Sequence, residues 1–184
     1  MLFNFIGGET GLWRVSQMKT VVGEPLEAVE AIEIIKGNSE DLPANRKWIL
    51  RGATSYERYT TRAEKDALGA IQPKLNRPEA VCAALIPIRK SAAWWNLAAD
   101  QRREILEAKS KHIAFGIKYL PAIARRLHHS RDLPGEEFDF LTWFEYAPAD
   151  AEKFDELVGF LRRSEEWKYV EREIDIRLVR SENK

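Results

Sequence analysis

A strand–helix–strand pattern that occurs twice along the chain limits the folds open to this sequence. Near the C-terminus, an alternating aromatic run is followed by a segment with helical apolar spacing and then by a second alternating run: FDFLTWFEYA, ADAEKFDELVGFL and KYVEREIDIRL. The same order fits an earlier trio: ILRGATSYERY, TRAEKDALGAIQ and AVCAALIPI. The last run alternates between an apolar and a charged set: Val170, Ile174, Ile176 and Leu178 against Glu171, Glu173, Asp175 and Arg177.

Strand-like segments outnumber the helices available to connect them, so a purely parallel sheet is disfavoured. We therefore expect an α+β fold with antiparallel sheets and helices packed on one face. Residues 1–20 alternate loosely and predict a strand or hairpin. A long helix is expected within residues 91–120, ended by Pro121, and residues 122–135 are expected to hold a short apolar segment and a turn. Apolar residues at helical spacing predict one more helix, starting near Pro25: Leu26, Val29, Ile32 and Ile35.

Composition places the chain among ordinary globular proteins and argues against several classes of partner. With 184 residues it suits one large domain or two small fused ones, and it can bury a core without disulfides. Its 29 basic and 29 acidic residues balance, so no charge excess favours nucleic acid as a partner. No apolar run reaches the roughly 18 residues of a membrane span and no secretion signal is evident. We therefore expect a cytoplasmic protein without a membrane partner.

Few residues can carry metal or nucleophilic chemistry. The single cysteine, Cys82, excludes an internal disulfide and is typical of a buried core residue. The sequence holds three histidines and no H-E-x-x-H, P-loop, G-x-G-x-x-G or G-x-S-x-G motif. His128 and His129 are neighbours that cannot share a helix face, and we expect them to be half-exposed.

His112 lies in a different setting. Ile105, Ala108, His112 and Phe115 recur at spacings of three and four, which puts the imidazole on the buried side of the expected helix. A histidine in such a place is more often a core residue than a ligand. A buried imidazole that faces a pocket is also the arrangement of an axial haem ligand. That role needs a carboxylate partner, an aromatic pocket and a charged or hydrogen-bonding group on the opposite face.

Candidates exist for each of these supports, and spacing alone leaves them open. Glu165 and Glu166 could supply the carboxylate or form a solvated helix end. Arg125 and Arg126 could supply the opposite charge or lie at the surface. The aromatic candidates, which could equally be plain core, are Trp94, Trp95, Trp143 and the phenylalanines of residues 138–146.

Five segments in this order and spacing resemble the chlorite dismutase family, and its short-chain branch most closely: GATSYERY, AALIPIRKSAAWWNL, HIAFGIKYLPAIARRLHHSRDL, FDFLTWFEY and LRRSEEWKYVEREIDIRL. The resemblance covers residues 45–180. It implies a subunit of two ferredoxin-like halves that form a dimeric α+β barrel, with a truncated N-terminal half at residues 1–95 and a haem-binding half at residues 96–184. It also implies a homodimer, since the short branch of the family forms dimers.

The resemblance implies roles for particular residues. His112 resembles the axial ligand of the iron of haem b, and Glu165 resembles the carboxylate that accepts a hydrogen bond from it. Arg125 resembles the mobile distal arginine, and Gln72 resembles the polar residue that positions this arginine. The residues that resemble those holding the haem propionates and the proximal edge are Tyr59, Trp94 and Trp95.

The implied reaction converts chlorite to chloride and dioxygen at a haem iron. Arg125 suits it, because an arginine stays protonated and its planar fork can hold a small anion. Relatives of the same fold decarboxylate coproporphyrin-haem; they carry glutamine at the distal position and need a tyrosine near a propionate. Arg125 therefore argues against that alternative, whereas Tyr59 leaves it open. Two further alternatives are a haem-binding or haem-transfer module without turnover, and a non-haem oligomeric barrel with His112 in its core.

Overall fold

The computed structural model describes residues 1–37, 43, 45–54 and 59–181, and within them eight strands close into a barrel. Neighbouring strands pair antiparallel throughout these residues, in the order β1-β3-β2-β8-β5-β7-β6-β4. The strands are β1 (Leu2–Gly8), β2 (Trp13–Val22), β3 (Ala31–Lys36), β4 (Arg46–Ala53), β5 (Cys82–Lys90), β6 (Ala124–His129), β7 (Phe140–Tyr146) and β8 (Val170–Arg180). The expected α+β class with antiparallel strands is confirmed.

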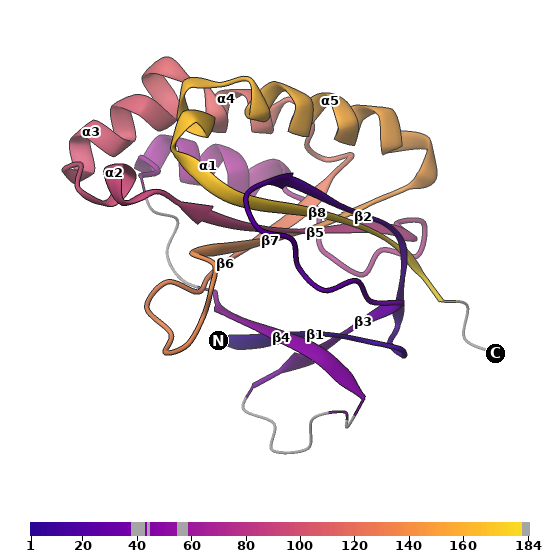
Figure 1. Ribbon diagram of the computed structural model, residues 1–184. Helices are drawn as coiled ribbons and strands as arrows, with labels where there is room; N and C mark the ends of the chain where they lie inside the picture. The colour runs from indigo at the N-terminus through magenta and orange to yellow at the C-terminus, as the bar shows by residue number, and fades with distance from the viewer. Residues whose placement is uncertain (38–42, 44, 55–58, 182–184) are drawn as a thin grey trace.

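The helices lie over one side of the barrel, as Figure 1 shows. α1 (Arg62–Ile71) follows β4, and β5 leads into α2 (Ala92–Trp95), α3 (Ala99–Arg103), the π-helix η1 (Glu104–Lys109) and α4 (His112–Ile117). Between β7 and β8 come η2 (Pro148–Asp150), α5 (Ala151–Arg162) and η3 (Glu165–Tyr169). In Figure 1 these helices lie above β5, β7 and β8, whereas β1, β3 and β4 lie on the far side of the barrel.

Each end of the chain contributes four neighbouring strands to the barrel. The last four strands follow the order β8-β5-β7-β6, and the first four follow the order β4-β1-β3-β2. In both sets the first strand therefore lies between the fourth and the third. The two sets meet along a long β2–β8 ladder and at β4–β6, where Ala53 faces His129.

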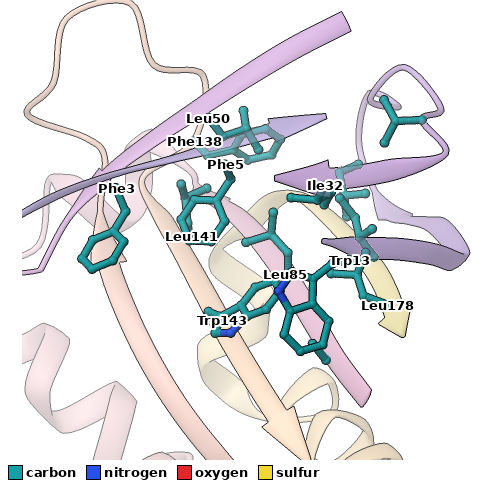
Figure 2. Close-up of a cluster of buried hydrophobic side chains, with 14 residues drawn as sticks. Phe3, Phe5, Trp13, Ile32, Leu50, Leu85, Phe138, Leu141, Trp143 and Leu178 are labelled. Carbon is teal, nitrogen blue, oxygen red and sulfur yellow. The ribbon is translucent and has the colours of Figure 1, made fainter. Parts of the chain in front are cut away.

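Two apolar cores use opposite faces of the same strands. Inside the barrel, Phe5 of β1 and Trp13 of β2 pack against Trp143 of β7, and Figure 2 shows these rings meeting among aliphatic side chains. On the other face, Phe154 of α5 packs against Phe144. Because β5 and β7 are buried on both faces, their sequences are almost continuously apolar.

Three segments differ from the expectation. The helix expected near Pro25 is wrong: residues 31–36 form β3, because Ile32 and Ile34 pack into the barrel core while the backbone of this segment pairs with β1 and β2. The single long helix within residues 91–120 is broken, since Lys111 adopts a left-handed φ of 54° between η1 and α4. The short apolar segment after Pro121 is the strand β6. Residues 55–58, part of the GATSYERY motif, lie outside the described residues.

Candidate functional site

A cavity lies between the helices and the face of the sheet that they cover. It contains about 1330 Å³ of space, counting its open mouth. Its floor comes from alternate residues of β5, β6 and β7, and most of the rest of its wall comes from α1, α4, α5 and η3. Most of the lining is apolar, so the few charged side chains that reach it act in poorly solvated surroundings.

His112 is the first residue of α4 and lines this cavity. The preceding residue offers no side-chain cap, and the carboxylate of Glu107 takes its place. It accepts from the backbone nitrogen of Ile113 at 2.7 Å and from that of Ala114 at 3.2 Å. These bonds satisfy the first free N–H groups of the helix and hold the backbone that carries the imidazole.

Glu166 provides the carboxylate next to His112. Its Oε2 lies 2.6 Å from Nδ1 of His112, and its Oε1 accepts from Nζ of Lys90 at 2.7 Å. Its own backbone nitrogen donates to Oγ of Ser110 at 2.8 Å. Burial acts to raise the pKa of Glu166, but the neighbouring His112 and Lys90 outweigh burial and lower this pKa to about 2. Glu166 is therefore ionised at neutral pH.

The prediction that Glu165 accepts the hydrogen bond from His112 is wrong. Glu165 begins η3, and its carboxylate pairs with Lys168 at 2.7 Å, where both side chains are exposed. Successive side chains of a 3₁₀-helix point about 120° apart, so two adjacent glutamates cannot both face the cavity. The sequence offered both candidates, and only the orientation of η3 separates them.

Arg125 and Arg126 lie on opposite faces of β6. Successive side chains of a strand alternate, and Arg125 shares its face with Leu127 and His129, which also line the cavity. The guanidinium of Arg126 lies on the other face, 5.3 Å from the centroid of the Phe3 ring. Of the two candidate arginines, Arg125 is therefore the one that reaches the cavity.

Gln72 ends α1 beside β6. Its Nε2 donates to the main-chain carbonyl of Arg125 at 2.9 Å, so this hydrogen bond is made to the backbone of the arginine. It ties the helix end to the strand that presents Arg125.

Trp94 and Tyr59 both line the cavity. Trp94 is 1% exposed, and its indole Nε1 has no hydrogen-bond partner among the described residues. The hydroxyl of Tyr59 accepts from Nη1 of Arg102 at 2.8 Å, and its ring meets the edge of Trp94 with centroids 6.2 Å apart. Two polar aromatic side chains thus stand together at one part of the wall.

Trp95 points elsewhere. Its Nε1 donates to Oδ2 of Asp139 at 3.1 Å, and the guanidinium of Arg131 lies 3.8 Å from its ring centroid. Of the two neighbouring tryptophans, Trp94 lines the cavity and Trp95 does not, because consecutive residues of α2 point in different directions. Its position gives no support to the expected contact with a cofactor.

The expectation that His128 and His129 are half-exposed is wrong. They are 1% and 7% exposed, because β6 sends one into the barrel and the other towards the cavity. The His128 ring lies 4.9 Å from that of Phe3 and 5.0 Å from that of Phe5, and burial lowers its pKa to about 4. The charged sequence of β6 gave no indication that both faces of this strand are covered by other parts of the chain.

Sequence reasoning missed three charged residues at the cavity: Lys90, Arg162 and Glu173. Lys90 is 5% exposed although it ends a strand, a position typical of a surface lysine. The alternation of β8 was predicted, but its charged face lies under α5, where Arg162 meets Glu173 and Asp175. The one sequence signal for these residues was the alternation of charged and apolar residues in β8, which is equally typical of a strand with one face in solvent.

These residues fit a haem. Within the described residues no group of three or more His, Cys, Asp or Glu side chains could hold a metal ion, so an iron here would depend on a macrocycle for its other ligands. The Nδ1 atom of His112 is engaged by Glu166, which leaves Nε2 for a metal. The buried indole N–H of Trp94 could donate to a propionate.

The sequence profile of the family described as chlorite dismutase matches residues 43–181, more than half of the chain. The chain belongs to the chlorite dismutase family. A chlorite dismutase from Ideonella dechloratans is 36% identical over 87 residues, which cover 47% of this chain and 28% of that protein. The matched part is thus well under two thirds of that relative's length.

Solved structures of the chlorite dismutase family have the same fold. Dimeric chlorite dismutases from Nitrobacter winogradskyi are 55% identical, with a TM-score of 0.90 over 97% of this chain and 99% of that chain. A mutant chlorite dismutase from Candidatus Nitrospira defluvii is 26% identical, with a TM-score of 0.62 over 75% of this chain and 56% of that chain. The family expected from the sequence is confirmed. Within the described residues, no helix has the length and hydropathy needed to cross a bilayer.

Proposed function

We propose that this chain is a haem b enzyme that converts chlorite to chloride and dioxygen. One observation carries the proposal: His112, backed by Glu166, and Arg125 line a single apolar cavity in a member of the chlorite dismutase family. The relative that is 55% identical over nearly the whole chain is named a chlorite dismutase, which supports the same substrate here.

His112 would hold the haem iron through Nε2. When bound, the haem supplies the redox chemistry that breaks Cl–O bonds and forms the O–O bond. The anionic Glu166 accepts the hydrogen bond from Nδ1, which makes the imidazole a stronger electron donor. Trp94 would donate its free indole N–H to a propionate, with Tyr59 beside it.

Arg125 would hold the anion. A guanidinium stays protonated at every working pH, and its fork matches two oxygens of a small oxyanion. The apolar lining strengthens this attraction, because few water dipoles compete with it. The hydrogen bond from Gln72 to the carbonyl of Arg125 would fix the strand position from which the guanidinium reaches. An arginine at this place argues against the coproporphyrin-haem decarboxylase alternative.

The test measures oxygen release from the haem-loaded chain after chlorite is added. We expect the wild type to release oxygen, Arg125→Ala to keep its Soret band but lose most turnover and bleach sooner, and Arg126→Ala to behave as the wild type. Arg126 is the matched control, because it leaves the same strand on the other face. A haem-loaded wild type that releases no oxygen would favour the non-catalytic haem-binding alternative.

We further propose that the chain consists of two ferredoxin-like halves and forms a homodimer. The shared strand order of β1–β4 and β5–β8 supports two halves, and in the described connection between β1 and β2 no helix intervenes, which agrees with a truncated N-terminal half. The pairing of β5 with β7 and β8 supports a boundary between α1 and β5, earlier in the chain than the boundary at residue 95 expected from the sequence. Light scattering should give twice the 21.2 kDa mass of the chain. A cytoplasmic location stays a prediction from the sequence.

A further inference from the structure

A chain of hydrogen bonds links α5, β8 and η3, the short helix that also contains Glu166. The indole Nε1 of Trp167, the residue directly after Glu166, donates to Oε2 of Glu173 at 2.7 Å. The other oxygen of Glu173 accepts from Nε and Nη2 of Arg162 at 2.8 and 2.6 Å. All three side chains line the cavity that also contains His112.

The burial of this network distinguishes it from a surface ion pair. Glu173 is 0% exposed, and the side chain of Arg162 is 22% exposed. Burial acts to lower the pKa of Arg162, but Glu173 and Asp175 outweigh burial and raise this pKa. A buried ion pair adds little net stability compared with well-packed apolar residues, because both charges lose their hydration. A buried ion pair in the wall of this cavity is therefore better explained by a role in orienting neighbouring side chains than by a contribution to the free energy of unfolding.

Trp167 connects this network to the ion pair beside His112. It follows Glu166 in the short helix η3, so its anchoring limits how far the Glu166 backbone can move. Its ring centroid lies 5.3 Å from Nζ of Lys90, and that of Trp94 lies 4.6 Å from the same nitrogen. The two rings attract the ammonium that holds Glu166. A displaced Trp167 would therefore disturb both Glu166 and Lys90.

We propose that Glu173, held by Arg162, is a positioning residue for the pair of Glu166 and His112. Its hydrogen bond to Trp167 fixes η3, and η3 in turn fixes the distance and angle between the carboxylate and the imidazole. Glu173 itself touches neither iron nor substrate in this role. The inference rests on the proposed function, because its consequence is read through the iron that His112 would ligate.

Trp167→Phe tests the hydrogen bond, because it keeps a ring over Lys90 and removes the indole N–H. Trp48→Phe is the matched control: it also removes an indole hydrogen bond, from Nε1 to the carbonyl of Glu27 at 2.9 Å, and neither residue lines the cavity. Both variants are loaded with haem, and the iron–histidine stretching frequency and the reduction potential are measured. We expect Trp167→Phe to lower the frequency and raise the potential, since the imidazole donates less electron density, and Trp48→Phe to change neither.

Glu173→Gln and Glu173→Ala separate orientation from packing. The glutamine can still accept from Trp167, so we expect its stretching frequency to lie closer to that of the wild type than the frequency of the alanine variant. If Trp167→Phe leaves both the frequency and the potential unchanged, the positioning role is wrong, whether or not the Glu173 variants fold. If the wild type shows no iron–histidine stretch, the proposed axial role of His112 fails instead, which keeps the two failures distinct.

Discussion

At the scale of single residues, the site depends on which of two adjacent side chains faces the cavity. Arg125 and not Arg126 reaches it from β6, and Glu166 and not Glu165 reaches it from η3. A shift of one residue in either element would turn Arg125 or Glu166 away from the cavity and break the contacts that hold it there. The site is therefore sensitive to the angular position of short elements, which is fixed by contacts such as that of Gln72 with Arg125.

The two glutamates of η3 should respond differently to the same change. Glu166→Gln leaves the buried ammonium of Lys90 without its charged partner, so we expect the free energy of unfolding to fall by about 3–5 kcal/mol. Glu165→Gln removes only an exposed pair with Lys168 and should change it by less than about 1 kcal/mol. Urea denaturation measures both values. Equal losses in the two variants would contradict the assignment of Glu166.

His128 should make stability depend on pH. Its pKa is about 4 in the folded chain and 6.5 as an ordinary value, so the unfolded chain binds a proton more readily between these limits. Its contribution is fully present above pH 6.5 and is lost as the pH falls through 4, by about 3 kcal/mol in total. Urea denaturation between pH 4 and 8 should show this loss in the wild type and a smaller one in His128→Leu. If the free energy of unfolding depends on pH equally in both proteins, His128 is not the source of this pH dependence.

At the scale of elements, α5 decides the environment of the sheet face beneath it. Its inner side buries Phe154 and its last residue, Arg162, meets the acidic residues of β8. An apolar helix face and a charged strand face are thus packed together, with ion pairs at one end of the contact. α5 therefore supplies part of the apolar wall of the cavity and part of the network behind Glu166.

Truncation of Phe154 should loosen this element. The side chain is 0% exposed and its ring centroid lies 4.7 Å from that of Tyr146, so Phe154→Ala should lower the free energy of unfolding by about 3–5 kcal/mol. Lys153→Ala, one residue earlier on the exposed side, should cost less than about 1 kcal/mol. Denaturant midpoints compare them. A loss for Phe154→Ala as small as that of the control would contradict the packing of α5 on β7.

At the scale of the whole molecule, the two seams that close the barrel differ in length within the part of the chain that the structure describes. β2 and β8 pair along most of their length, whereas β4 and β6 pair at Ala53 and His129. Among the described residues, which leave out 55–58 next to the end of β4, the second seam pairs at this one position, and it lies beside the cavity wall formed by β6. Opening at this seam would separate the two sets of four strands without breaking either set.

Hydrogen exchange should show this asymmetry. We expect the backbone amides of β5 and β8, which are paired on both sides, to exchange most slowly. Amides at the ends of β4 and β6 near Ala53 and His129 should exchange sooner, because the short seam can open locally. Mass spectrometry of peptides from these four strands measures the difference. Equal protection at both seams would show that side-chain packing, and not the ladder, closes the barrel.

The sequence by itself determined those helices and strands that are long enough to show several repeats of a hydrophobic pattern. The strand–helix–strand order of β4, α1 and β5 and of β7, α5 and β8 was predicted because each segment carries several repeats of its pattern. The motifs indicated the family. These features depend on neighbours close in the chain. The periodicity that placed His112 on a buried helix face does not hold across the break at Lys111, and the His112 side chain is 32% exposed.

Only the tertiary structure decided the rest. β3 and β6 become strands because distant partners pair with them, and His128 is buried because Phe3 and Phe5, more than 100 residues earlier, cover it. The choice of Glu166 over Glu165 and the burial of Lys90 also depend on contacts between elements far apart in the chain. Local periodicity specifies a face of an element, whereas the packing of distant elements determines what that face meets.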